Sequence, residues 1–427
     1  MSVAPMWPDG GSRLRTAAIA MVVGVLALTG WLGWSAYRSA LLWKAALAAV
    51  EVKAWDRVEA ALASRAWYRP SDLDAIKLRV EAALQSGDRN AAVCALSTVP
   101  EWSELAESAH SMRGRLLKEL YRPAEAIDEL RACLRLNPRR VEAYRELIAI
   151  FGIQRRAREQ EEQLWALHDG SGAAIAALRM LAQPIPIIPP GTLAKGTDEG
   201  TVLRRCLDTR PHDQFLRAPL AYFLRNRGQV AEARALLEPW LAGPRSDAEM
   251  RIEDVACMLD QGEVAAARRW FEPLNEWLGA HPRYWLLRGD WCRMQDRHAE
   301  AVESYREAVG RDPRSGEARY RLAQALRAAG LTRDANETIA HHQRLLRLSL
   351  LAGRISETAP DPNMLAQAAR LCHDLGRDRE ARGWYAAVLR VAPSDGEARR
   401  FLGLPEPPTR SQDAGIAAGE RRRDPQS

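Results

Sequence analysis

The chain has 427 residues, of which 47% are hydrophobic and 27% are charged. A chain of this size can bury a large core, and it exceeds the usual length of one compact domain, so it is either a multi-domain protein or a repeat array. The formal net charge of +6 is modest for this length and does not by itself imply a nucleic-acid partner. Nearly all of the positive charge is arginine, a bias that fits a GC-rich bacterial genome.

An apolar stretch near the N-terminus, Thr16–Tyr37, runs for 22 residues without a charge. As a helix it is about 33 Å long at ~1.5 Å per residue, enough to cross the roughly 30 Å hydrocarbon core of a bilayer. Trp31, Trp34 and Tyr37 suit the interface between membrane and water. We therefore predict a short tail over residues 1–15 and a transmembrane helix over residues 16–37. A cleavable signal peptide is the competing interpretation, although the stretch is longer than the apolar region of a typical signal.

The orientation of this anchor is not decided by the flanking charges. Arg13 and Arg15 precede it, and Arg38 and Lys44 follow it closely, so the positive-inside rule gives no clear answer. A short tail followed by one span usually acts as a signal anchor. We therefore expect a single-pass protein of the plasma (inner) membrane whose remaining chain lies on the periplasmic or other extracytoplasmic side, with the cytoplasmic orientation as the alternative.

Small residues recur along the chain in steps of 34, which identifies an internal repeat. One series is Ala233, Ala267, Ala301 and Ala335. The same period gives Val58, Ala92, Ala126 and Gln160 in the first half, and a last unit is centred on Ala381. Together with a weaker unit at Glu199, the units number about ten.

The pattern within one unit resembles the tetratricopeptide repeat family. The best unit carries Trp285, Gly289, Ala301, Tyr305, Ala308 and Pro313, and another carries Ala126 and Pro138. The family's unit is a pair of antiparallel helices of about 34 residues. The resemblance implies an all-α protein, a right-handed superhelical solenoid of about ten helical hairpins over residues 38–402, preceded by the transmembrane helix.

Each of these positions has a physical role in such a hairpin. Gly289 and Ala301 fall where the two helices cross closely, and a larger side chain there costs on the order of 1–3 kcal/mol in overpacking. Trp285 and Tyr305 fill the wider gaps on either side. Pro313 lacks a backbone N–H and ends the second helix.

Two insertions and a tail interrupt the register. Residues 183–200 contain four prolines and three glycines, which forbid a regular helix. We favour a surface loop there, with a hinge or a polyproline-type docking segment as alternatives. A second insertion, at about residues 346–362, predicts a lengthened helix and an exposed connection. Residues 403–427 lack apolar periodicity and predict a disordered tail.

No catalytic, cofactor-binding or metal-binding motif is present. The six cysteines are widely spaced without a CxxC pair, and no HExxH or paired histidine motif occurs. The cysteines fit small packing residues. We therefore assign no catalytic residues, no cofactor and no metal ligands, and we do not predict an enzyme.

Binding is the remaining function. In this family, stacked hairpins present a concave surface built from the first helices, which generally holds peptides or proteins. Here its exposed positions include Tyr222, Asp290, Tyr320 and Gln324. The sequence thus favours a non-catalytic, membrane-anchored scaffold or adaptor for protein or peptide partners, in an envelope or secretion-related assembly.

Two other functions stay open. An anionic polymer or nucleic acid could bind through arginines at Arg155, Arg156 and Arg158 and at Arg421–Arg423, although the modest net charge disfavours nucleic acid. The weakest alternative is an enzyme with a site in the insertion over residues 183–200. Ala20 and Gly24 permit helix dimerisation without requiring it, so the sequence leaves homo-oligomerisation open.

Overall fold

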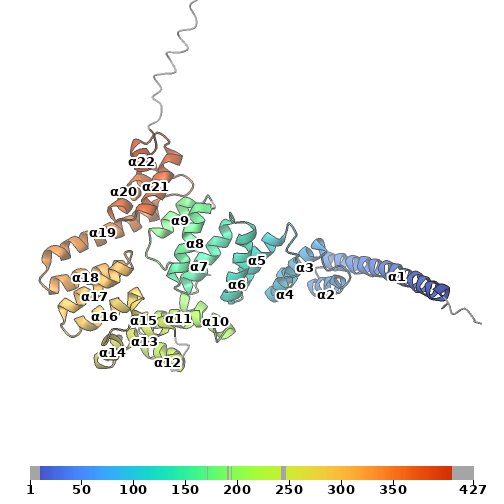
Figure 1. Cartoon of the computed structure of the whole chain (residues 1–427), viewed down its shortest axis with the longest axis horizontal. Coiled ribbons are helices and arrows are strands. Elements are labelled where there is room, and N and C mark those ends of the chain that lie inside the picture. The colour runs from blue at the N-terminus through green and yellow to red at the C-terminus, as the bar shows by residue number, and fades with distance from the viewer. Residues whose placement is uncertain (1–9, 171, 190–191, 194, 242–246, 406–427) are drawn as a thin grey trace, which may run out of the picture. The chain divides into compact units, whose positions relative to one another are not determined.

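The computed structural model describes residues 10–170, 172–189, 192–193, 195–241 and 247–405, with side chains from residue 19 onward. The described residues form 22 helices and no strand (Figure 1). They divide into two compact units, one containing residues up to Leu120 with Ala124–Asn137, the other containing Tyr121–Pro123 and the residues from Pro138 onward. The all-helical expectation is therefore confirmed. Of the predicted N-terminal tail (residues 1–15), residues 1–9 lie outside the described residues, and residues 10–15 belong to a helix that begins at Gly10. Of the predicted C-terminal tail (residues 403–427), residues 406–427 lie outside the described residues.

The first unit is a run of helices, each packed on the one before it. Its helices are α1 (Gly10–Glu51), α2 (Trp55–Ala66), α3 (Leu73–Gln85), α4 (Arg89–Leu96), α5 (Ala106–Glu119) and α6 (Pro123–Leu136). Helix α1 is 42 residues long and serves two purposes. Its side chains from Ile19 to Trp34 are exposed, whereas Ala46 and Ala49 are buried against Val58 of α2. The predicted membrane helix thus continues without a break into the first helix of the first pair.

Part of α1 is long and apolar enough to cross a membrane. The candidate span is Ile19–Glu51, within the part of the chain that was searched. Length and composition of this kind fit a membrane anchor or a signal sequence.

The second unit contains sixteen helices. They are α7 (Val141–Ile153), α8 (Ala157–Gly170), α9 (Ala174–Leu181), α10 (Glu199–Thr209), α11 (Gln214–Asn226), α12 (Val230–Leu241), α13 (Ala248–Asp260), α14 (Val264–Phe271), α15 (Glu276–Gly279), α16 (Pro282–Arg293), α17 (His298–Arg311), α18 (Gly316–Ala328), α19 (Thr332–Arg354), α20 (Pro362–Asp374), α21 (Asp378–Val391) and α22 (Gly396–Phe401). In the region of the second predicted insertion, α19 is 23 residues long and residues 355–361 connect it to α20.

The small-residue register has a simple structural counterpart. With one exception, every predicted position is the fourth residue of a second helix and is at most 1% exposed: Val58, Ala92, Ala126, Gln160, Ala233, Ala267, Ala301, Ala335 and Ala381. At that point the second helix crosses its partner closely, so a small side chain is favoured.

The exception is Glu199, which is the first residue of α10. Leu203 and Cys206, four and seven residues later, are buried, as are Leu130 and Cys133 after Ala126. The register therefore holds, but α10 begins about one turn late because Gly196 has a left-handed backbone (φ +81°) and Asp198 caps the helix. The fifth pair is also divided between neighbours: α9 packs on α8, and α10 packs on α11.

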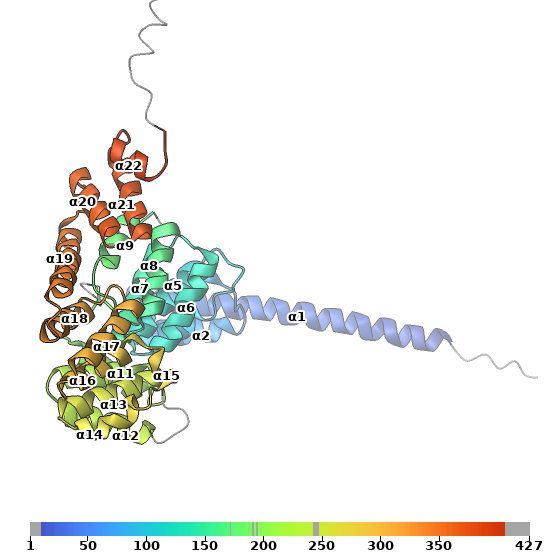
Figure 2. The same ribbon diagram turned by 60° about the vertical axis from the view of Figure 1, so that its left-hand side comes forward.

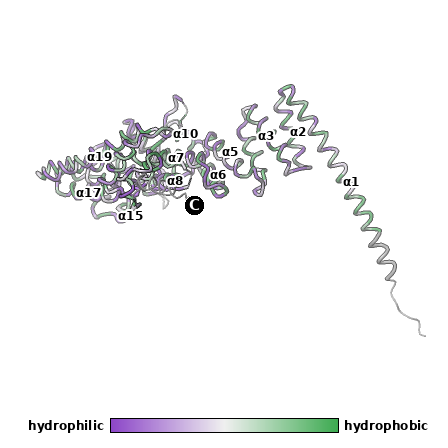
Figure 3. The backbone as a smooth tube through the Cα atoms, turned by 90° about the horizontal axis from the view of Figure 1, so that it is seen from above, coloured by the Kyte–Doolittle hydropathy of each residue, from purple (hydrophilic) through white to green (hydrophobic). Residues whose placement is uncertain are grey.

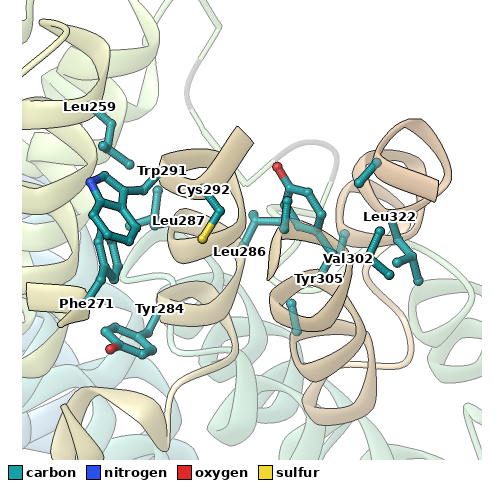
Figure 4. Packing of buried hydrophobic residues seen from close by; sticks show 14 of the residues in the cluster. Leu259, Phe271, Tyr284, Leu286, Leu287, Trp291, Cys292, Val302, Tyr305 and Leu322 are labelled. Carbon is teal, nitrogen blue, oxygen red and sulfur yellow. The ribbon is translucent and has the colours of Figure 1, made fainter. Parts of the chain in front are cut away.

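A large buried cluster lies in the middle of the second unit (Figure 4). Phe271 and Trp291 are in ring contact, with centroids 5.3 Å apart. Next to them Gly289 lets α17 approach α16, since a Cβ added at Gly289 would lie 2.4 Å from a ring carbon of Tyr305. The glycine is required by a close approach of a ring, not by its backbone conformation.

The 183–200 insertion is held within the second unit. Its anchor is Gln160, which is 0% exposed. The Gln160 Nε2 atom donates to the carbonyl oxygens of Ile148 (2.8 Å) and Ile187 (2.5 Å), and the Ile187 N–H donates to its Oε1 atom (2.9 Å). Gly152 makes room for this crossing, because a Cβ there would lie 2.2 Å from the Ile187 carbonyl oxygen. The loop is thus held at Ile187 by a buried amide.

The second unit closes on itself. Helix α9 packs against α19 and α21, which follow it by more than 150 residues (Figures 1 and 2). Arg377 donates to the carbonyl oxygen of Leu181 (2.7 Å), and Arg179 donates to that of Ala352 (3.1 Å). Gly383 lies against Leu178, to which an added Cβ would approach within 2.9 Å. We call these contacts the closure seam.

Candidate binding surface

The first helices of the middle pairs carry a connected set of charged side chains. Helix α11 packs on α13, and α13 packs on α16. Arg283 forms an ion pair with Glu253, whose second contact is Arg225 at 3.4 Å. Arg225 also donates to Asp260 (2.8 Å). Because Glu253 is almost fully buried, both arginines are needed to compensate its charge.

The set continues to α18 through Asp290. This carboxylate accepts a hydrogen bond from the Tyr305 hydroxyl (2.7 Å) and forms an ion pair with Arg321. Burial raises the pKa of Tyr305 to about 12, so the hydroxyl stays a donor at any physiological pH. Burial, and then the positive charges of Arg225 and Arg283, lower the pKa of Arg321. We call Arg225, Glu253, Asp260, Arg283, Asp290 and Arg321 the charged ladder.

Three guanidinium groups lie close to the ring of Tyr222 on α11. The carbon at the centre of the Arg155 guanidinium lies 3.5 Å from the ring centroid, and those of Arg283 and Arg225 lie at 4.7 and 5.6 Å. Such contacts contribute about 0.5–2 kcal/mol each, depending on their exposure to water. Arg225 and Arg283 are already paired with Glu253. Within the part of the chain that the structure describes, Arg155 forms no ion pair.

Arg155 reaches Tyr222 from the turn between α7 and α8. It has a left-handed backbone, with φ +56°, an uncommon conformation for a long side chain. Glu249 lies near the same group. Burial alone would raise the pKa of Glu249, but a hydrogen bond with His281 (2.6 Å) and the charges of Arg283 and Arg155 outweigh it and lower that pKa. Glu249 is therefore held in its ionised form and is bound to His281.

The four residues predicted for the concave surface have different environments. Tyr222 and Asp290 lie in or beside the charged ladder. Asp290 is only 8% exposed, so it is largely committed to Tyr305 and Arg321. Tyr320 is exposed and lies beside His342 of α19, with ring centroids 5.9 Å apart. Gln324 is exposed on α18.

The predicted packing residues lie on both helices of a pair: Trp285 and Gly289 are in α16, and the alanines and Tyr305 are in second helices, which Pro138 and Pro313 follow. Trp285 donates from Nε1 to the Gly279 carbonyl oxygen (2.7 Å), and Arg311 lies over its ring. Ala308 is buried in α17, and Pro313 follows that helix by two residues. Pro138 stands between α6 and α7, and its carbonyl oxygen accepts from the Tyr144 hydroxyl (3.1 Å).

Sequence reasoning missed the ladder itself. The available signal was Glu253 and Asp254 within the otherwise apolar run Ile252–Leu259, every residue of which is buried. Buried carboxylates require partners. The partners of Glu253, however, come from the neighbouring first helices, about 30 residues away in each direction. Its pairing could therefore not be derived without the stacking geometry.

The three neighbouring arginines predicted for an anionic polymer make different contacts. Arg155 covers Tyr222. Arg156 stacks on Phe215 (4.2 Å) and pairs with Glu159 (2.6 Å). Arg158 is exposed and pairs with Glu162 (3.3 Å). Arg421–Arg423 lie outside the described residues.

No metal site is formed by the residues that the structure describes. Of the six cysteines, Cys94 is exposed and the other five are buried. Burial raises the pKa of Cys206, Cys257 and Cys372 to about 12. Thiols of this kind are poorly reactive, in agreement with a packing role.

A comparison with known families identifies one segment. Residues 293–345 match the tetratricopeptide repeat family, and they comprise the end of α16, the helices α17 and α18, and the first half of α19. Proteins built from these repeats typically bind other proteins and are typically non-catalytic. Among curated proteins, none matches the chain.

Several solved structures align with much of the chain at low identity and low TM-score. Human IFIT1, solved as a dimer with PPP-AAAA, is 17% identical, with 74% of this chain and 91% of that chain covered and a TM-score of 0.32. The Cut9–Hcn1 hetero-tetramer of APC/C is 15% identical, with 90% and 86% covered and a TM-score of 0.32. A tetratricopeptide repeat protein from Parabacteroides merdae is 13% identical, with 68% and 99% covered and a TM-score of 0.29.

Proposed function

We propose that this chain of tetratricopeptide repeats is a non-catalytic scaffold, anchored in a membrane by α1, that binds a segment of a partner protein on the face of the charged ladder. The observation that carries the proposal is the guanidinium group of Arg155, which stacks 3.5 Å from the Tyr222 ring centroid and has no carboxylate in ion-pair distance within the described chain. A cation held against a ring, beside arginines that are already paired, is suited to a carboxylate supplied from outside.

The partner's binding segment is therefore expected to be acidic. Arg155 is fixed in position by its stacking on Tyr222, so it loses little conformational entropy when a carboxylate binds. The ladder carboxylates are bound to their own arginines and do not compete for it. We propose that the partner belongs to an envelope or secretion-related assembly, because a continuous anchor helix would hold the repeats close to the bilayer.

The binding face is tested by photo-crosslinking in cells. A photoreactive phenylalanine at position 222 should yield a discrete protein adduct, and the same group at position 320 should not. Arg155→Asn should reduce the yield at position 222 by about tenfold or more, since a charge-assisted hydrogen bond is worth about 1.5–3 kcal/mol. Asparagine tolerates the left-handed backbone at this position.

Arg158→Asn is the matched control. It removes an exposed arginine three residues away that already pairs with Glu162, so the adduct should persist. Loss of the adduct with both variants, together with its removal by nuclease or by moderate salt, would favour the anionic polymer over a protein partner. Failure to form any adduct at position 222 would contradict the proposal that the partner binds on the face of the charged ladder.

The compartment is tested separately. We propose a single-pass protein of the inner membrane with its repeats outside the cytoplasm. A tag at the C-terminus should be digested by protease in intact cells stripped of any outer barrier, while the chain stays in the membrane fraction. Protection until lysis would reverse the orientation, and release of a shortened chain would show that the apolar segment is a cleaved signal.

A further inference from the structure

One connection of the first unit lies at the level where the apolar part of α1 ends. Tyr68, just after α2, contacts Trp34 of α1 with ring centroids 5.8 Å apart. Trp34 lies about 27 Å along the helix from Thr16 at ~1.5 Å per residue, close to the full thickness of a hydrocarbon core of about 30 Å. If α1 spans a bilayer, as proposed above, the α2–α3 connection is therefore at the membrane interface.

The connection is held firmly at this level by Arg65. This side chain is buried, and its Nη1 atom donates to the carbonyl oxygen of Ser39 on α1 (2.5 Å). Its Nε atom donates to Asp72 at the start of α3 (3.1 Å). The guanidinium also lies 4.8 Å from the ring of Trp43. One arginine thus ties α1, α2 and α3 together, so the height of the connection along α1 is set by internal contacts.

A second connection lies at the same end of the first unit. Each helix from α2 to α5 packs on its predecessor, and α2 folds back along α1 (Figure 3). Packed helices joined by short connections alternate in direction. The α2–α3 and α4–α5 connections are therefore at the end toward which the exposed part of α1 projects. The α1–α2 and α3–α4 turns are at the opposite end.

Each of these two connections exposes a tryptophan. Trp67, between α2 and α3, is 85% exposed, and Trp102, between α4 and α5, is 80% exposed. A tryptophan held in water at this level gains from transfer to the interfacial region of a bilayer, where its ring meets apolar chains and its N–H meets water or headgroups. Cations are close by: Arg38 lies over Trp34, and Arg69 is exposed in the same connection as Trp67.

We propose that this end of the first unit rests on the surface of the phospholipid bilayer that α1 crosses, with Trp67 and Trp102 in the interfacial region and Arg38 and Arg69 against lipid phosphates. The inference rests on the proposed anchor. It adds that the first two pairs are membrane-bound along an edge, so that the unit is held at three points instead of one. The charges and the indole rings suit phospholipid, since guanidinium pairs with phosphate in two-pronged hydrogen bonds.

The test uses the full chain in lipid nanodiscs with an environment-sensitive fluorophore on single cysteines. A Cys94→Ser background removes the one exposed native thiol, and the five buried thiols are left unlabelled under native conditions. Labels are placed at Trp67→Cys and Trp102→Cys, at Val52→Cys in the opposite turn, which is 70% exposed, and at Val25→Cys in the apolar stretch of α1.

We expect the labels at positions 67 and 102 to be blue-shifted and quenched at least threefold more strongly by headgroup-level nitroxide lipids than the label at position 52. The label at position 25 should be quenched best by nitroxides deep in the acyl chains. Exchanging zwitterionic for anionic lipid should strengthen quenching at position 67, and Arg69→Gln should weaken that gain.

The outcomes separate the two proposals. Deep quenching at position 25 with labels 67 and 102 no more quenched than label 52 would overturn the interfacial contact and leave the anchor standing. Absence of quenching at position 25 would overturn the anchor, and the contact with it. If labels 67 and 102 are shielded in cells but exposed to water in nanodiscs, a protein covers them, and the lipid assignment is wrong.

Discussion

At the scale of single residues, the packing of a pair depends on a few close approaches. Gly289 accepts the ring of Tyr305, and the Tyr305 hydroxyl in turn reaches Asp290 in the charged ladder. The pattern of a small residue opposite a large one could be predicted, because it repeats with the period of the chain. The role of Gln160 could not be predicted from the repeat pattern, because its partner is the backbone of Ile187 in an irregular loop.

Two glycines of neighbouring helices provide a matched stability test. Gly289→Ala should lower the free energy of unfolding by about 1–3 kcal/mol, because the new methyl group meets a buried ring. Gly310→Ala, on the exposed side of α17 with no atom within 4 Å of its added Cβ, should be neutral or stabilising by up to about 1 kcal/mol. Urea unfolding followed by circular dichroism measures both. Equal effects would show that the close approach at Gly289 is not under strain.

At the scale of elements, the local sequence predicts where a helix begins better than it predicts which other helices that helix packs against. The fourth-residue register predicts where nine second helices begin. At Glu199 the register holds, but α10 begins about one turn late because of the glycine and the cap before it. The packing of α9 on α19 and α21 could not be predicted, because the repeat pattern specifies contacts only with the next pair in the chain.

The insertion over residues 183–200 depends on one buried amide, which gives a prediction for the loop as an element. Gln160→Leu keeps the volume but removes the hydrogen bonds to Ile187, so the unfolding free energy should fall by about 1–3 kcal/mol. Hydrogen exchange at Ile187 should become faster, and the loop should be cleaved more readily by protease. Gln324→Leu, on the exposed face of α18, should stay within about 0.5 kcal/mol of the parent chain. An unchanged exchange rate at Ile187 would contradict the pinning role.

At the scale of the whole molecule, the closure seam changes how the second unit unfolds. An open repeat array frays from its ends, because each repeat is supported only by its neighbours. Here α9 is supported by α8 and also by α21, although Arg179 and Arg377, which make the contacts, look like ordinary surface arginines in the sequence. Helices on both sides of the seam should therefore exchange their amide hydrogens in concert.

The closure seam is tested by placing a large side chain between two of its helices, α9 and α21. Gly383→Leu places a side chain against Leu178 and His168, so exchange should become at least tenfold faster in α9 and in α21 together. Gly353→Leu is the control, since a Cβ at this exposed position of α19 has no neighbour within 4 Å. Hydrogen exchange with mass spectrometry resolves the peptides. Faster exchange in α21 alone would mean that the seam does not couple the two segments.

The unbroken course of α1 has a mechanical consequence. One half of this helix is exposed and apolar, and the other half packs on α2. Because the helix is continuous, the two halves move as one rigid rod. Any tilt or torsion imposed on the apolar half is delivered directly to the first pair. Inserting one residue near Tyr37 would rotate that pair about the α1 axis by about 100° and shift it by about 1.5 Å. Four inserted residues would bring it back to within about 40° of its original orientation. The orientation of the first helical pair about the axis of α1 is thereby fixed relative to the apolar segment.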